Sequence, residues 1–127
     1  MRRLLILFTF LFATSAFAAT PQGFALGDQP ASPGYVPAPA FAFNSTGGPI
    51  RIVRGGAGQY KVIFFSLGAA GAGHRSDVQV NPVDGRTVCM TRGWGGNPDL
   101  TVAIDCFDIP TGALHDSKYT VLVTFSP

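Results

Sequence analysis

The stretch from Lys118 to Phe125, KYTVLVTF, decides the fold. Large apolar residues recur there at every second position, which is the pattern of a β-strand with one face on a core. Residues 59–66, QYKVIFFS, repeat the pattern with apolar residues on both faces. This predicts a strand near the centre of a sheet. In the first stretch we expect four side chains to be buried, those of Tyr119, Val121, Val123 and Phe125.

The rest of the chain after residue 18 also favours strands and turns. It is rich in Gly, Pro, Val, Phe and Thr, and the sequence contains no Glu, so residues that favour helices are scarce. Short strands with turns about every eight to twelve residues are typical of sandwiches. We therefore expect a single all-β domain over residues 19–127, an antiparallel β-sandwich of about seven or eight strands, with residues 19–22 flexible.

The strongest turn signal is NSTGGP, residues 44–49. Its glycines allow positive φ angles, and its Asn, Ser and Thr side chains can bond to the backbone. We expect residues 41–43 and 50–54 to form a hairpin across this turn.

Residues 1–18 have the parts of a secretory signal peptide. A basic start, Met1 to Arg3, precedes a short apolar run from Leu4 to Phe12, and small residues at Ala16 and Ala18 allow cleavage after Ala18. We expect a secreted, extracellular protein, with a periplasmic location as the alternative. No later stretch is long and apolar enough to enter a membrane.

The net charge of +2 comes from the predicted signal segment. Arg2 and Arg3 are two of the nine basic residues, so residues 19–127 carry seven basic residues against seven acidic ones. The seven are scattered singly along the chain, whereas nucleic acids and anionic lipids are bound by clustered Lys and Arg. We expect no nucleic-acid partner and no membrane partner after cleavage.

The chain has two cysteines, Cys89 and Cys106, and an even pair in an exported protein favours a disulfide. Antiparallel pairing of residues 87–92 with 100–108 brings them together, and the short loop makes the bridge worth about 3 kcal/mol. Two thiols without further His or Cys do not complete a tetrahedral metal site, so we expect no metal and no cofactor.

The pairing of these two segments leaves a conflict of phase. Alternation places Cys106 on the inner face, but Cys89 lies opposite in phase to the apolar residues Val88 and Met90. A bulge, or a strand buried on both faces, would resolve the conflict.

A set of residues along the chain resembles an uncharacterised β-rich domain of secreted bacterial proteins, notably actinomycete exoproteins, in which it often occurs as tandem copies. The resemblance spans about residues 23–123 and rests on FNSTGG at 43–48, Arg54, Gly56, Gly58, Tyr60, Val62, Phe64, LG at 67–68, VQV at 78–80, Cys89, Trp94, CF at 106–107, Gly112, DS at 116–117 and YTVL at 119–122. It implies an exported β-fold, a disulfide between the two cysteines and a first strand over residues 23–29. It implies no active site. This chain departs from the family in having one copy and a longer loop over residues 69–76.

The tripeptide His115-Asp116-Ser117 contains the residue types of a hydrolase triad. Adjacent residues of an extended chain point to opposite faces, whereas a triad needs side chains that converge from separate segments. We expect a loop instead, in which Asp116 and Ser117 bond to the backbone and position the last strand.

Four other residues are candidates for binding or catalysis. His74, beside Arg75, or His115 could act with an Asp in a small exported hydrolase, although no spacing typical of a metal site is present. Trp94 lies among glycines that leave its indole free to stack on a sugar or a partner's apolar group. Alternatively, Trp94 folds over the end of the core and covers the disulfide.

We expect this protein to be a monomeric, noncatalytic interaction or structural module, with an unidentified protein or glycan as its partner. The hydrolase with His74 or His115, and a glycan-binding surface module with Trp94, are the alternatives.

The intact mass of the secreted protein tests the predictions of export and of the disulfide together. We expect the mass of a chain that starts at Ala19. This mass should rise by two hydrogens when the protein is reduced. A mass that includes residues 1–18, or thiols that react with an alkylating reagent in the folded protein, would contradict these predictions.

Overall fold

The computed structural model describes residues 19–127, and the predicted signal peptide lies outside the described residues. Within this range the chain forms nine strands and two short helices, α1 (Leu67–Ala70) and the 3-10 helix η1 (Pro39–Phe41). The strands are β1 (Gln22–Gly27), β2 (Gly34–Tyr35), β3 (Ala42–Asn44), β4 (Ile50–Gly56), β5 (Gln59–Phe64), β6 (Arg75–Pro82), β7 (Thr87–Gly95), β8 (Leu100–Asp108) and β9 (Tyr119–Ser126).

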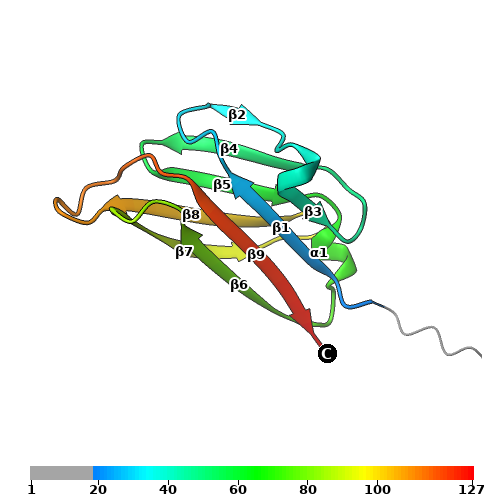
Figure 1. The fold of residues 1–127 in the computed structure, drawn as a ribbon. Coiled ribbons are helices and arrows are strands. Elements are labelled where there is room, and N and C mark those ends of the chain that lie inside the picture. The colour runs from blue at the N-terminus through cyan, green and yellow to red at the C-terminus, as the bar shows by residue number, and fades with distance from the viewer. Residues whose placement is uncertain (1–18) are drawn as a thin grey trace, which may run out of the picture.

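The strands form two antiparallel sheets, with the orders β3-β1-β9-β6 and β2-β4-β5-β8-β7. Figure 1 shows the four-stranded sheet, with β1 in blue and β9 in red, lying across the five-stranded sheet. The predicted all-β fold with one disulfide is confirmed. The strand missing from the predicted count is β2, whose two residues are too few to show a period of two.

Side chains from the facing sides of the two sheets form one core. The four residues predicted to be buried on β9, Tyr119, Val121, Val123 and Phe125, are all buried. Strand β5 lies between β4 and β8, so its predicted central position is confirmed. Its inner side chains Tyr60, Val62 and Phe64 are buried, whereas Lys61 on its other face is exposed.

The turn at residues 44–49 is present, but the predicted hairpin across it is wrong. Strand β3 pairs with β1 in one sheet, and β4 pairs with β5 in the other, so the turn carries the chain between sheets. The Asn44 side chain holds it there: its Nδ2 donates to the Phe65 carbonyl (2.9 Å) and its Oδ1 accepts from the Thr46 amide (3.1 Å). Turn chemistry predicts a reversal of the chain but not which sheet receives the next strand.

The predicted pairing of β7 with β8 is confirmed, and Cys89 lies directly opposite Cys106. Both cysteines are buried, and their sulfurs form the disulfide with a Cα–Cα distance of 4.1 Å. At Cys89 the structure shows neither of the two arrangements expected to resolve the phase conflict, a bulge or burial on both faces. Cys89 faces the core, and the apolar residues Val88 and Met90 are exposed on the outer face of the sheet; the bulge of β7 lies further along, between Thr91 and Gly93.

Strand β1 begins at Gln22, the last residue of the segment predicted to be flexible, and Gln22 pairs with Thr124 of β9. The Phe125 amide donates to the carbonyl of Pro21 (3.2 Å). The beginning of β1 and the end of β9 therefore lie side by side. No helix within residues 19–127 is long and apolar enough to cross a membrane.

Candidate functional site

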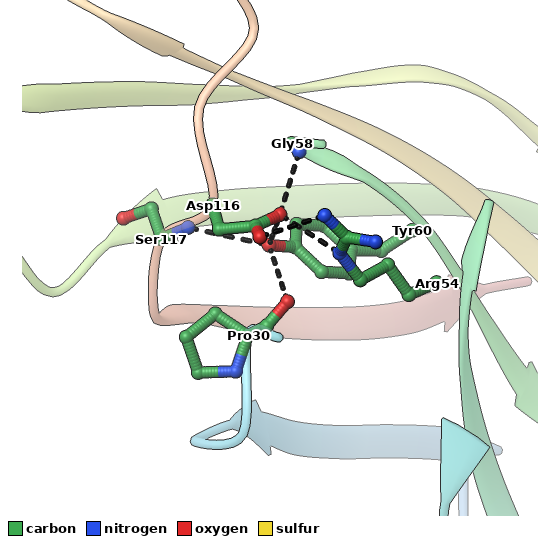
Figure 2. Close-up of polar contacts among 6 residues, drawn as sticks. All are labelled: Pro30, Arg54, Gly58, Tyr60, Asp116 and Ser117. Carbon is green, nitrogen blue, oxygen red and sulfur yellow. Dashed lines mark hydrogen bonds and ion pairs between the residues drawn. The ribbon is translucent and has the colours of Figure 1, made fainter. Parts of the chain in front are cut away.

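The carboxylate of Asp116 is the centre of the densest polar cluster in the described chain (Figure 2). Arg54 at the end of β4 donates to both carboxylate oxygens, from Nε (3.0 Å) and Nη2 (2.8 Å). Oδ1 also accepts from the Gly58 amide (2.8 Å) and the Tyr60 hydroxyl (3.0 Å). One carboxylate thus ties the loop before β9 to both strands of the β4–β5 hairpin and to its turn.

The cluster continues through the Tyr60 hydroxyl, which also lies 3.1 Å from the Pro30 carbonyl and accepts from the Ser117 amide (3.2 Å). The Ser117 hydroxyl lies 2.7 Å from that of Thr87, at the start of β7. These contacts confirm the prediction that Asp116 and Ser117 bond to the backbone and position the last strand. They also join the β1–β2 loop and β7 to the same point.

The charges in this cluster stabilise each other. The Arg54 guanidinium, with the Gly58 amide and the Tyr60 hydroxyl, lowers the pKa of the Asp116 carboxyl below its usual 3.8. Burial is the main cause that raises the pKa of the Tyr60 hydroxyl, so this group stays protonated and remains a donor. Asp116 is already engaged by four donor atoms on three residues, and the arrangement therefore serves to hold the fold together.

The two histidines lie at opposite ends of β9. His74 immediately precedes β6, whose first residue pairs with Ser126, while His115 lies in the loop just before Tyr119. Eight residues of extended strand separate those ends, about 24 Å at about 3.4 Å per residue. Figure 1 shows the same separation, with the orange β8–β9 loop at the far end from the C-terminus. Neither imidazole makes a hydrogen bond or ion pair with an Asp among residues 19–127.

Trp94 and the His74–Arg75 segment come together at one side of the sandwich. The Trp94 indole donates from Nε1 to the Ser76 hydroxyl (2.9 Å), so it links β7 of one sheet to β6 of the other. Trp94 pairs with Val102, four residues along β8 from Cys106, and remains 42 % exposed. The indole therefore closes the side of the core away from the disulfide rather than covering it, and part of the ring stays in solvent.

Within residues 19–127, no group of three or more His, Cys, Asp or Glu side chains is arranged to hold a metal ion.

A continuous apolar surface lies on the outer face of the five-stranded sheet. Val88 of β7 pairs with Phe107 of β8, and Phe107 bridges to Leu114 in the following loop. Paired side chains on one face lie about 5 Å apart, so these three form a row. Met90, two residues from Val88 on the same face, extends it, and Ile109 lies just beyond the end of β8, where its amide donates to the Arg86 carbonyl (2.9 Å). Val88, Met90, Ile109 and Leu114 are exposed, with Met90 at 50 %. We call these five residues the apolar row.

Sequence reasoning missed the apolar row because it left open which face Val88 and Met90 occupy, given their conflict of phase with Cys89. The outer face of the four-stranded sheet also carries apolar side chains, Phe43, Phe24 and Leu122, which are paired across its strands. There, Thr120 and Thr124 of β9 flank Leu122 on the same face. The apolar row is instead continued along β7 by Met90, which is exposed.

None of the protein families, curated proteins or solved structures with which the chain was compared matches it. The resemblance to the secreted bacterial β-domain therefore stays a prediction.

The substitution Asp116→Asn tests the role of the carboxylate. It removes the charge that Arg54 pairs with, and we expect a loss of about 2 kcal/mol in the free energy of unfolding at neutral pH. Because the folded-state pKa of Asp116 lies below the unfolded value, its contribution is complete above about pH 4 and is lost as the pH falls through the folded pKa. Urea unfolding of the parent and of Asp116→Asn should therefore show a smaller difference in the free energy of unfolding near pH 3 than at neutral pH.

Asp77→Asn is the matched control, because Asp77 is exposed on β6 and makes no ion pair among the described residues. It should change the free energy of unfolding by less than about 0.5 kcal/mol at either pH. An Asp116→Asn protein that is as stable as the parent at neutral pH would contradict the structural role of the cluster.

Proposed function

We propose that this protein is a noncatalytic, exported interaction module that binds a partner protein on the outer face of its five-stranded sheet. The observation that carries the proposal is the apolar row. Exposed apolar residues that occur singly are normal on a protein surface, whereas contiguous ones rimmed by polar groups mark interaction sites. Here Val88, Phe107 and Leu114 are contiguous, and Asp105, which pairs with Met90, lies on their rim.

The composition of the row favours a protein as the partner. Aromatic residues and Met are enriched in the centres of protein interfaces, and the exposed Met90 thioether adapts to irregular apolar surfaces. The row lies on paired strands of a sheet that the Cys89–Cys106 disulfide bridges directly beneath it. Such a surface is rigid before binding, so a partner would not have to order it.

A photo-crosslinking amino acid in place of Met90 tests the proposal, with Gln79 on the outer face of the other sheet as the control position. We expect position 90 to form an adduct with one protein of the extracellular fraction and position 79 to form none. With that protein purified, Val88→Lys should weaken binding at least about tenfold, since it places a charge in an apolar contact, whereas Gln79→Lys should leave binding unchanged.

Equal adducts at both positions, an adduct at position 79 alone, or binding that Val88→Lys does not affect would overturn the proposed surface. Positions 79 and 88 are exposed, so we expect both lysine variants to unfold at the same temperature as the parent. Thermal unfolding thus separates a loss of binding from a loss of folding.

Glycan binding at Trp94 is a second candidate, supported by the 42 % exposure of that residue. A sugar that stacks on the indole should change its fluorescence, and Trp94 is the single tryptophan of the chain. Titration with a panel of neutral and acidic oligosaccharides should then give a saturable change. Fluorescence that stays constant across the panel would count against this candidate.

A further inference from the structure

Basic residues that are far apart in the sequence lie on the same outer face as the apolar row. Arg51 on β4, Lys61 on β5 and Arg92 on β7 are all exposed there. Arg51 pairs with Ile63, two residues from Lys61 on the same side of β5, so Arg51 and Lys61 are diagonal neighbours about 7–8 Å apart. Asp105 is the acidic residue that this face carries.

The nearly neutral charge of residues 19–127 therefore conceals a separation of charge. Three basic residues against one acidic residue give this face a net charge of +2, and the remainder of the described chain carries −2. Asp28, Asp84 and Asp99 lie in turns between strands. An acidic partner would be attracted to the face of the five-stranded sheet and oriented on it.

A small hollow opens on this face between two of the cations. It has a volume of about 140 Å³ and is lined by Val53, Gly55, Gln59, Tyr60, Lys61 and Arg92. At about 30 Å³ for each water in the liquid, this is the volume of about five waters, which is enough for a carboxylate. Gly55 contributes no side chain and so leaves that side of the hollow open.

Both cations at the hollow are available to a ligand. Arg92 Nη1 lies 3.6 Å from Asp105 Oδ1, too far for a hydrogen bond, and the Arg92 side chain is 51 % exposed. The pair is exposed on the Arg92 side and buried on the Asp105 side, where Asp105 Oδ1 accepts no hydrogen bond within the described chain. Lys61 makes no ion pair there. The Arg92 guanidinium can thus give two parallel hydrogen bonds to an incoming carboxylate.

The neighbours of these cations favour a polypeptide as the source of the carboxylate. Aliphatic side chains of Val53 and Ile63 lie beside Lys61 and Arg51 on the same face, and Met90 connects this region to the apolar row. In an extended peptide, residues two apart point to the same side and are separated by about 6.8 Å. The Arg51 guanidinium lies on the β2 side of β4, with Nη2 beside Gly34, so another acidic residue of the same extended segment would meet this third cation.

Resting on the proposed function, we propose that the partner contributes an extended acidic segment. One carboxylate occupies the hollow between Lys61 and Arg92, and another pairs with Arg51. Apolar residues of the partner cover the apolar row beside it. The cations thus select and orient the segment, and the apolar contacts hold it.

A synthetic peptide of alternating Glu and Val is the probe, titrated into the purified protein by calorimetry at low salt. We expect saturable binding that Lys61→Gln/Arg92→Gln weakens at least about tenfold and that added salt weakens further. Arg75→Gln/Lys118→Gln is the matched control, because it also removes one Arg and one Lys, from exposed positions in and beside the other sheet, and it should bind within about twofold of the parent. The reversed variant Lys61→Glu/Arg92→Glu should instead bind a peptide of alternating Lys and Val.

Several results would overturn the acidic segment as the ligand. These are equal weakening by both Gln variants, binding of a Gln-Val peptide as tight as that of the Glu-Val peptide, no binding at all, or tighter binding of polygalacturonate, an acidic glycan, through the same residues.

The outcome is distinguishable from the test of the proposed function. The protein captured at position 90 could bind the Lys61→Gln/Arg92→Gln variant as tightly as it binds the parent. This result would support the docking surface and contradict the acidic segment. If the Glu-Val peptide binds at the hollow but position 90 captures no protein, the hollow stands as an acidic-peptide site and the docking of a protein on the apolar row does not.

Discussion

The Asp116 carboxylate is the constraint on which one whole end of this sandwich depends. A β-sandwich needs its loops held in place where the strands leave the sheets, because loops bury little apolar surface of their own. Here Arg54, Gly58 and Tyr60 donate to a single side chain, and Tyr60 extends the connection to the β1–β2 loop. An ion pair on an open surface contributes little. This one is half-buried and shared with two further donors, so it fixes the relative positions of segments up to 62 residues apart.

The polar groups at that end and the side chains on the outer face have separate roles. Asp116 and Tyr60 are engaged within the protein, so they have little capacity left for a ligand. Met90 and Lys61, in contrast, face solvent on paired strands. Holding the proposed interaction surface on strands rather than on loops makes it rigid, and the disulfide bridges the inner side of the same two strands as the apolar row. The disulfide and the proposed surface thus lie on opposite sides of the same β7–β8 ladder.

Sequence patterns predicted the fold well wherever a long segment had one buried face. The period of two found β9, β5 and β8, because burial of alternate residues is a local property. The disulfide followed instead from the two cysteines of a chain predicted to be exported. The period of two could not find the destination of the chain after Asn44, which depends on the contact of Asn44 with Phe65. It also left open which face Val88 and Met90 occupy, because an apolar side chain looks the same in sequence whether it faces the core or solvent. It also treated Arg51, Lys61 and Arg92 as scattered, because only the register of the strands brings them to one face.

The positions of the first and last strands bear on how the domain transmits force. Strands β1 and β9 are antiparallel neighbours, and Gln22 pairs with Thr124 at the end where the chain enters one strand and leaves the other. Tension applied through the two ends would therefore open this pair one hydrogen bond at a time, starting at Pro21 and Phe125. A pair loaded in shear would resist with all of its bonds together. The geometry is that of a terminal strand pair that opens at low tension and is poorly suited to carrying a mechanical load along the chain.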